Sequence, residues 1–306
     1  MKNLKTLSML LAMLALGAAQ DASATLKVFT CEPEWAALAK VLGGDDVEAY
    51  SASTALQDVH QVQARPSLIA KFRQADLVIC TGAELEIGWL PALNEKANNP
   101  KVAPGQPGYF EASQFVQMLE VPTSTDRALG DVHPYGNPHV QTGPQNLAPV
   151  AKALAARLAE VDGAHAPAYA RRYADFSARW EKSLAALKVK AAPLKGAVVV
   201  SHHKTWVYLY DWLGVKEVAT LEPKPGVPPS GAQLQNVLAI VKAQPVKAVV
   251  YSSYEDARGS QWLSEQAHIP AVQLPFSVGG APGADDLFGF YDVLITRLLQ
   301  ATGSAK

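Results

Sequence analysis

The hydrophobic positions of this chain alternate between short continuous runs and longer stretches with helical spacing. Near the start, the pattern predicts strands at 26–30, 47–50 and 77–80 and helices at 33–42, 67–74 and 84–96. In the last third the same alternation returns, with strands at 196–201, 215–220, 246–252 and 271–274 and helices at 205–213, 231–243, 259–267 and 285–301. Continuous apolar strands that alternate with helices are typical of parallel sheets covered on both faces.

Between these two halves the spacing is purely helical. A helix is expected from Asn146 to the Asp162-Gly163 pair, and a second one over 167–187 with its aromatic and leucine residues three or four apart. Its length of about 30 Å suits a strut between two lobes, and its tyrosine and tryptophan stripe is expected to pack in the core. The predicted fold class is therefore α/β, with two parallel-sheet α/β lobes joined by a long backbone helix. The predicted division is a signal peptide at 1–24, an N-terminal lobe at 25–145, connecting helices at 146–190 and a C-terminal lobe at 191–306.

Two local features complete the expected secondary structure. Ser67 is expected to cap the helix that begins there, and the segment 98–131, rich in proline and glycine, is assigned no regular structure.

The first 24 residues have the layout of a secretory signal peptide. Two lysines precede an apolar run at 7–16, and Ala22-Ser23-Ala24 offers a small-residue cleavage site. The apolar run is too short to span a bilayer. Because no cysteine lies near the cleavage point, we expect an exported, soluble protein without a lipid anchor, beginning near Thr25.

Composition narrows the class further. The 306 residues are 49% hydrophobic with a formal net charge of -1, so the chain lacks the basic surplus of a nucleic-acid-binding protein. Its two cysteines, Cys31 and Cys80, each close an apolar run. In an oxidising compartment they form either a disulfide or two buried free thiols, and the residues leave both alternatives open.

Histidines carry the candidate chemistry. His60 follows the second predicted strand, His139 precedes the mid-chain helices, and His203 follows the strand at 196–201. Ligands of two-lobed α/β proteins gather beyond the carboxyl ends of strands, so the three imidazoles point to one cleft. Three neutral imidazoles suit zinc, although no HExxH or CxxC motif supports the assignment.

The residues near these histidines have expected roles as well. Asp58 either holds the His60 ring by a hydrogen bond or caps the turn at Ser67. His133 is expected at the rim of the site and His202 beside its ligands, while His165 and His268 are expected at the surface.

Three segments resemble the periplasmic zinc- and manganese-binding proteins of ABC transporters, in the order in which that family has them. They are DVHQVQARPSLIAKFRQADLVICTGAELEIGWL, GNPHVQTGPQNLAPVAKALAARL and SHHKTWVYLYDWLGV, and together they run over almost the whole mature chain. The resemblance implies that His60, His139 and His203 are the metal ligands. Manganese-binding members usually have a carboxylate at the third position, so three histidines favour zinc as the transported ligand over manganese.

The chain also departs from the family pattern. The aspartate that usually follows the last strand is missing, since Leu274 runs directly into Pro275. The fourth ligand is therefore water, Glu255 or Asp285. Val59 stands where the family has proline, Gly143 stands where it has aspartate, and the histidine-rich loop of many zinc-binding members is missing.

These features predict a binding protein rather than an enzyme. The resemblance implies a monomer that captures zinc in the periplasm and hands it to a membrane permease. One alternative is a zinc-dependent hydrolase with three histidines and a water, in which Glu255 is a possible base. Another is a protein that binds a metal chelate or an organic ligand in the same cleft.

Overall fold

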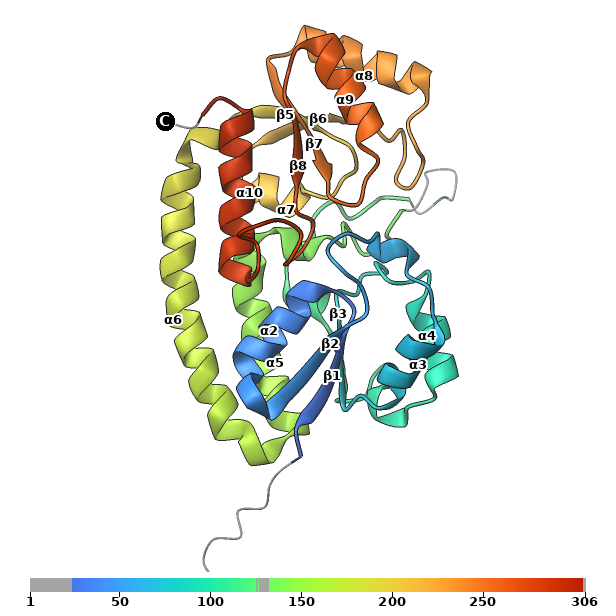
Figure 1. Cartoon of the computed structure of the whole chain (residues 1–306), viewed down its shortest axis with the longest axis vertical. Helices are drawn as coiled ribbons and strands as arrows, with labels where there is room; N and C mark the ends of the chain where they lie inside the picture. Colours follow the sequence, from blue (N-terminus) through green and yellow to red (C-terminus); the bar gives the residue numbers. More distant parts are fainter. Residues whose placement is uncertain (1–23, 125, 127–131, 305–306) are drawn as a thin grey trace, which may run out of the picture.

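The computed structural model describes residues 24–124, 126 and 132–304. Two four-stranded parallel sheets form its two lobes, which lie one above the other in Figure 1. The predicted signal peptide falls almost entirely on residues 1–23, outside the described residues. Among the described residues, no helix combines the length and the hydropathy that crossing a membrane requires.

The two sheets have the same strand order. In the N-terminal sheet it is β2-β1-β3-β4, formed by Leu26–Thr30 (β1), Val47–Ser51 (β2), Leu77–Cys80 (β3) and Tyr109–Glu111 (β4). In the C-terminal sheet it is β6-β5-β7-β8, formed by Val198–Ser201 (β5), Lys216–Thr220 (β6), Val246–Ser252 (β7) and Ala271–Leu274 (β8). All pairings are parallel, so the carboxyl ends of each sheet's strands meet at one edge.

The helices cover the sheets and join the lobes. Those of the N-terminal half are α2 (Pro33–Gly43), α3 (Pro66–Arg73), α4 (Leu90–Ala97) and α5 (Leu147–Val161). Those that follow are α6 (Ala166–Ala191), α7 (Val207–Leu213), α8 (Gly231–Ala243), α9 (Ala257–Ala267) and α10 (Leu287–Ala301). Prolines in the first turn begin α2, α3 and α4, and side chains of Ser230, Asp256 and Asp286 cap α8, α9 and α10.

Helix α6 is the backbone of the molecule. Its 26 residues correspond to about 39 Å, and in Figure 1 it runs along the side of both lobes. Its buried side chains Tyr169, Phe176 and Trp180 pack in the largest hydrophobic cluster, which confirms that the aromatic stripe is core. That cluster contains residues of both lobes, so α6 fixes them against one apolar interior. The predicted domain boundaries at 145 and 190 stay a prediction.

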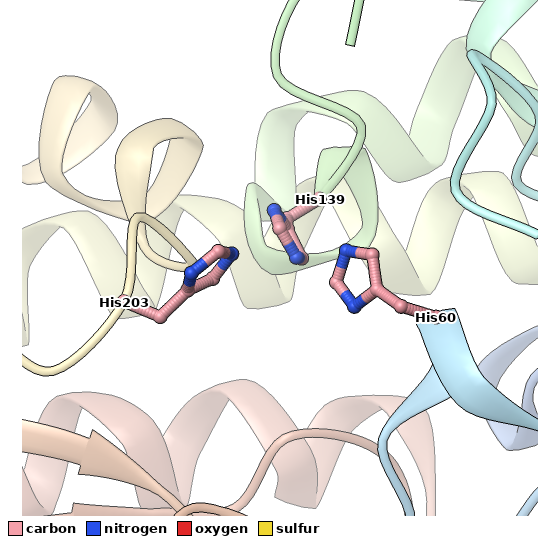
Figure 2. A group of neighbouring side chains, drawn as sticks. All are labelled: His60, His139 and His203. Atoms are coloured by element: carbon pink, nitrogen blue, oxygen red, sulfur yellow. The ribbon is translucent and has the colours of Figure 1, made fainter. Parts of the chain in front are cut away.

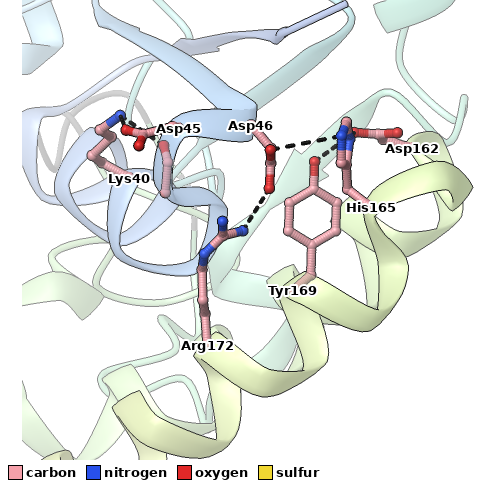
Figure 3. A network of polar contacts seen from close by, with 8 residues as sticks. Lys40, Asp45, Asp46, Asp162, His165, Tyr169 and Arg172 are labelled. Atoms are coloured by element: carbon pink, nitrogen blue, oxygen red, sulfur yellow. Dashed lines mark hydrogen bonds and ion pairs between the residues drawn. The ribbon is translucent and has the colours of Figure 1, made fainter. Parts of the chain in front are cut away.

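A polar network fastens α6 to the N-terminal lobe (Figure 3). Asp46, at the end of the short 3-10 turn η1 (Gly44–Asp46), accepts from Arg172 at 2.8 Å and lies 3.6 Å from the Nε2 atom of His165. The Nδ1 atom of His165 also lies 2.7 Å from Asp162. His165 is therefore partly exposed at the surface, where it also links two elements, and His268 is exposed at the end of α9, as expected for both.

Three predictions about secondary structure need correction. The helix expected over 84–96 begins only at Leu90, because the Glu86 carboxylate accepts the backbone N–H groups of Thr81 and Gly82 and holds the preceding segment in turns. Strand β4 lies within 98–131, the segment predicted to have no regular structure. Ser67 does not cap α3, because the helix begins one residue earlier, at Pro66, with Arg65 at its N-cap position.

The two cysteines form a disulfide. Cys31 directly follows β1 and Cys80 ends β3, two neighbouring strands, with their Cα atoms 4.8 Å apart. Of the two alternatives left open by the sequence, the structure therefore has the cross-link.

Candidate metal centre

His60 is fixed by the loop that follows β2. It lies in the 3-10 turn η2 (Val59–Gln61), whose N-terminal residue Asp58 accepts from the His60 backbone N–H at 3.0 Å. The same Asp58 oxygen lies 2.8 Å from the ring Nδ1 atom, and the Trp89 indole donates to the carbonyl of Val59 at 2.8 Å. Asp58 thus orients the ring, as one of the two sequence alternatives predicted.

His139 is held in the same way on the loop before α5. It precedes the turn η6 (Val140–Thr142), and the Asn137 Oδ1 atom accepts from its backbone N–H and faces its ring Nδ1, both at 3.0 Å. Asn137 also donates to the Lys204 carbonyl at 2.8 Å and accepts at its own carbonyl from the Tyr208 hydroxyl at 2.6 Å. His139 is therefore tied to the C-terminal lobe although it precedes that lobe in sequence.

His203 follows β5 at the carboxyl edge of the C-terminal sheet. Its Nδ1 atom lies 2.7 Å from Oε2 of Glu222, a residue just beyond the neighbouring strand β6. The backbone N–H of Glu222 donates to the His202 carbonyl at 3.0 Å, which fixes the carboxylate beside the ring.

The three rings converge on one point (Figure 2). Their centroids are 5.4 Å apart for His60 and His139, 5.8 Å for His60 and His203, and 5.2 Å for His139 and His203. One potential ligand atom of each ring lies within 4.8 Å of the others. His60 and His139 are 79 positions apart in the chain, and His139 and His203 are 64 positions apart. The three residues thus meet between the two lobes, where the sequence predicted a common cleft.

The hydrogen bonds select the ring nitrogen that is free. In each ring Nδ1 faces a side-chain oxygen, so a neutral imidazole carries its proton there and leaves the Nε2 lone pair available. The Nε2 atom of His139 is buried and has no hydrogen-bond partner. Such a nitrogen is costly to leave unpaired, and a bound metal ion would satisfy it.

The environment also keeps His139 in the form that can bind a metal ion. Burial, and then the neighbouring His203, His60 and His133 rings, lower the pKa of His139 well below its usual value. The ring is therefore neutral at neutral pH.

Of the three further candidates Glu255, Asp285 and His202, one lines a hollow beside the described histidines and two do not. Glu255 lines the hollow beside His60 and His203, its Oε1 atom is buried without a partner, and burial raises its pKa to about 8. Asp285 is exposed shortly before α10 and does not line either hollow beside the described histidines, so nothing in its position supports it as a fourth ligand. His202 is buried, with Nδ1 unpartnered, and shows no ring contact with the other histidines in the described part of the chain.

Two important residues were missed by sequence reasoning. Asn137 precedes His139 by two positions, as Asp58 precedes His60, so this repeated spacing could have identified it. Glu222 lies 19 positions from His203 in a proline-rich loop, where no local pattern pointed to it.

Comparisons with known proteins identify relatives over almost the whole chain. The family model for the periplasmic component A of the zinc-uptake complex, ZnuA, matches residues 28–301. The manganese ABC transporter substrate-binding lipoprotein PsaA of Streptococcus pneumoniae is 23% identical over 280 residues, covering 90% of this chain and 87% of that protein. The metal ABC transporter substrate-binding lipoprotein FimA of Streptococcus parasanguinis is 24% identical over 283 residues, covering 91% and 88% respectively.

Solved structures share the fold. A crystal structure of ZnuA superposes with a TM-score of 0.75 at 19% identity and covers 91% of this chain and 99% of its own. The periplasmic metal binding protein from Candidatus Liberibacter asiaticus superposes with a TM-score of 0.72 at 16% identity, covering 90% and 98%.

The fold and the sequence relationships define a substrate-binding protein of a metal ABC transporter. More particularly, the chain belongs to the family of the periplasmic zinc-uptake component ZnuA. Its transported substrate is a divalent metal ion, and its partner is the membrane permease of an ABC transporter. The alternative of a zinc-dependent hydrolase is wrong, because the related proteins are substrate-binding proteins and not enzymes.

Proposed function

We propose that this protein captures Zn²⁺ with the Nε2 atoms of His60, His139 and His203 and delivers it to its permease. It does so as a monomer in the periplasm, after removal of a signal peptide near Thr25. The observation that carries the proposal is the buried, unpartnered Nε2 atom of His139, which faces two further imidazoles whose Nδ1 atoms are also engaged by oxygen acceptors.

The donor set favours zinc over manganese. Three imidazole nitrogens with no carboxylate among them suit zinc, whereas manganese prefers oxygen ligands and binds most nitrogen sites more weakly. The relatives PsaA and FimA are named for manganese or for metal in general, and the family model is named for zinc. The ligand chemistry of this chain supports zinc, the metal for which the family model is named.

The space beside the rings supports a bare ion rather than a chelate. The two hollows that border the histidines have volumes of about 50 and 110 Å³. Pockets for organic ligands usually have volumes of about 300–1,000 Å³, so these hollows suit an ion with a few water molecules.

The same chemistry explains how the ion would be released. Neutral imidazoles compete with protons for the metal, so affinity falls as the pH drops through the histidine range. Because His60 belongs to the N-terminal lobe and His203 to the C-terminal lobe, separation of the lobes on the permease removes ligands from the ion.

A metal titration tests the proposal. The apo form of the mature protein is titrated with zinc alone and with manganese alone, next to the variants His139→Ala and, as a matched control on the surface, His268→Ala. We expect one tight zinc site in the wild type and the control, weaker manganese binding, and a loss of zinc affinity exceeding about 100-fold in His139→Ala, because it removes a ligand and not only a supporting contact. Zinc binding that His139→Ala leaves unchanged, or tight binding of a chelate but not of zinc, would contradict it.

A further inference from the structure

A fourth imidazole lies beside His60, at the edge of the three-histidine cluster. The ring centroid of His133 lies 5.5 Å from that of His60, a separation within the range of 5.2 to 5.8 Å found among the three clustered rings. His133 is half-buried and lines both hollows that border the cluster. Its ring therefore borders the space beside the cluster, outside the group of three ligand atoms that lie within 4.8 Å of one another.

The His133 ring lies beside the backbone of Glu84, in the loop that follows β3. Glu84 and its neighbour Ala83 have φ angles of 64° and 52°, a left-handed conformation that is unusual for residues other than glycine. The loop is thus held in a costly conformation where it borders this imidazole.

The charges of the site favour a neutral fourth ligand. Asp58 and Glu222 already place two carboxylates directly behind ligand rings, which together balance the charge of a divalent cation. Glu255, the competing candidate, would add a third negative charge to a buried site, and one of its oxygens is already engaged by the backbone N–H of Ser252 at 2.6 Å. An imidazole completes the coordination without this excess charge.

We infer that His133 is the fourth ligand of the bound ion and takes the place of the carboxylate that follows the last strand in related sequences. This inference rests on the proposed function. The nitrogens of a tetrahedral zinc site are about 3.3 Å apart, whereas the ligand atoms of the three clustered residues lie within 4.8 Å of one another, so these rings also draw inward when the ion binds. His133, which lines both hollows, moves with them toward the ion. Four nitrogen donors would strengthen the preference for zinc over manganese.

A crystal structure of the wild-type mature protein, loaded with one equivalent of zinc alone, tests the inference without depending on a variant. We expect a ring nitrogen of His133 at about 2.0–2.1 Å from the ion. A water molecule or Glu255 in the fourth position overturns the inference.

Affinity measurements in solution provide a second test. His133→Ala is expected to weaken zinc binding by at least about 10-fold while keeping one site, and to reduce the preference for zinc over manganese. The surface control His268→Ala is expected to leave both quantities unchanged, and Glu255→Gln tests the competing ligand. An unchanged affinity in His133→Ala, or a loss in Glu255→Gln instead, overturns the inference.

These results separate the two proposals. If His139→Ala abolishes zinc binding while His133→Ala has no effect, the three-histidine site stands and only the fourth ligand is wrong. If the wild type binds no zinc, or His139→Ala binds it normally, the proposed function itself fails.

Discussion

Glu222 accepts a hydrogen bond from the Nδ1 atom of His203 at 2.7 Å, across a distance of 19 residues in the chain. The two residues follow neighbouring parallel strands, β6 and β5, whose carboxyl ends meet at one edge of the C-terminal sheet. The fold thus places a carboxylate behind a candidate ligand, where it fixes the ring and raises the basicity of Nε2.

Removal of this carboxylate should weaken metal binding without removing a ligand. Glu222→Ala is expected to lower zinc affinity by about 10- to 100-fold, and Asp58→Ala, which frees the His60 ring, by a similar factor. Competition titration with a chelator measures both. Glu181→Ala, on the exposed face of α6, serves as the control. Equal affinities in all three variants would show that the carboxylates do not support the ligands.

The buried carboxyl group of Glu34 predicts a dependence of stability on pH. It lies on α2, accepts a hydrogen bond from Ser277 of the C-terminal lobe, and burial raises its pKa to about 7. Because the folded pKa lies above the unfolded value of 4.5, its stabilising contribution is complete below pH 4.5 and is lost as the pH rises through about 7.

Glu34→Gln therefore gains stability relative to the wild type as the pH increases, by on the order of 3 kcal/mol between about pH 5 and pH 8.5. Denaturant unfolding of the apo protein at both pH values measures the difference. Glu181→Gln is the matched control, and a difference for Glu34→Gln that does not vary with pH refutes the assignment.

The disulfide between Cys31 and Cys80 should contribute strongly to stability. It closes a loop with a sequence separation of 49, for which the loss of chain entropy in the unfolded state corresponds to about 4 kcal/mol. Replacement of both cysteines by alanine should lower the free energy of unfolding by about that amount, measured by denaturant titration. The unfolded wild-type protein should contain no thiol that reacts with a thiol reagent, and two reactive thiols would contradict the cross-link.

The contact between Asp46 and Arg172 should matter for the scaffold and not for the site. Both side chains are partly exposed, so the ion pair is expected to contribute at most about 1 kcal/mol. Asp46→Asn should lower the free energy of unfolding by up to this amount and leave zinc affinity unchanged. A double-mutant cycle with Arg172→Ala isolates the pair, and additive effects of the two substitutions would show that they do not interact.

Most elements of this fold could be predicted because local periodicity reports burial. Strands β1, β3, β7 and β8 and helix α8 have the predicted bounds, since each is a continuous apolar run or an amphipathic stretch between clear breaks. Strand β4 could not be predicted in this way, because its three residues form a strand only by pairing with β3. The helix expected from Glu84 failed because the Glu86 side chain bonds to the backbone at the end of β3 instead of facing solvent.

The sequence by itself determined the two α/β lobes, the long helix between them and the three loops that carry His60, His139 and His203, because these depend on periodicity and on residues close together in the chain. The tertiary structure alone decided that Glu222 lies behind the His203 ring, that Cys31 is bonded to Cys80, and that His133 lies beside His60. These features depend on contacts between residues far apart in sequence, whose distances are set only when the sheets form and the lobes pack against α6.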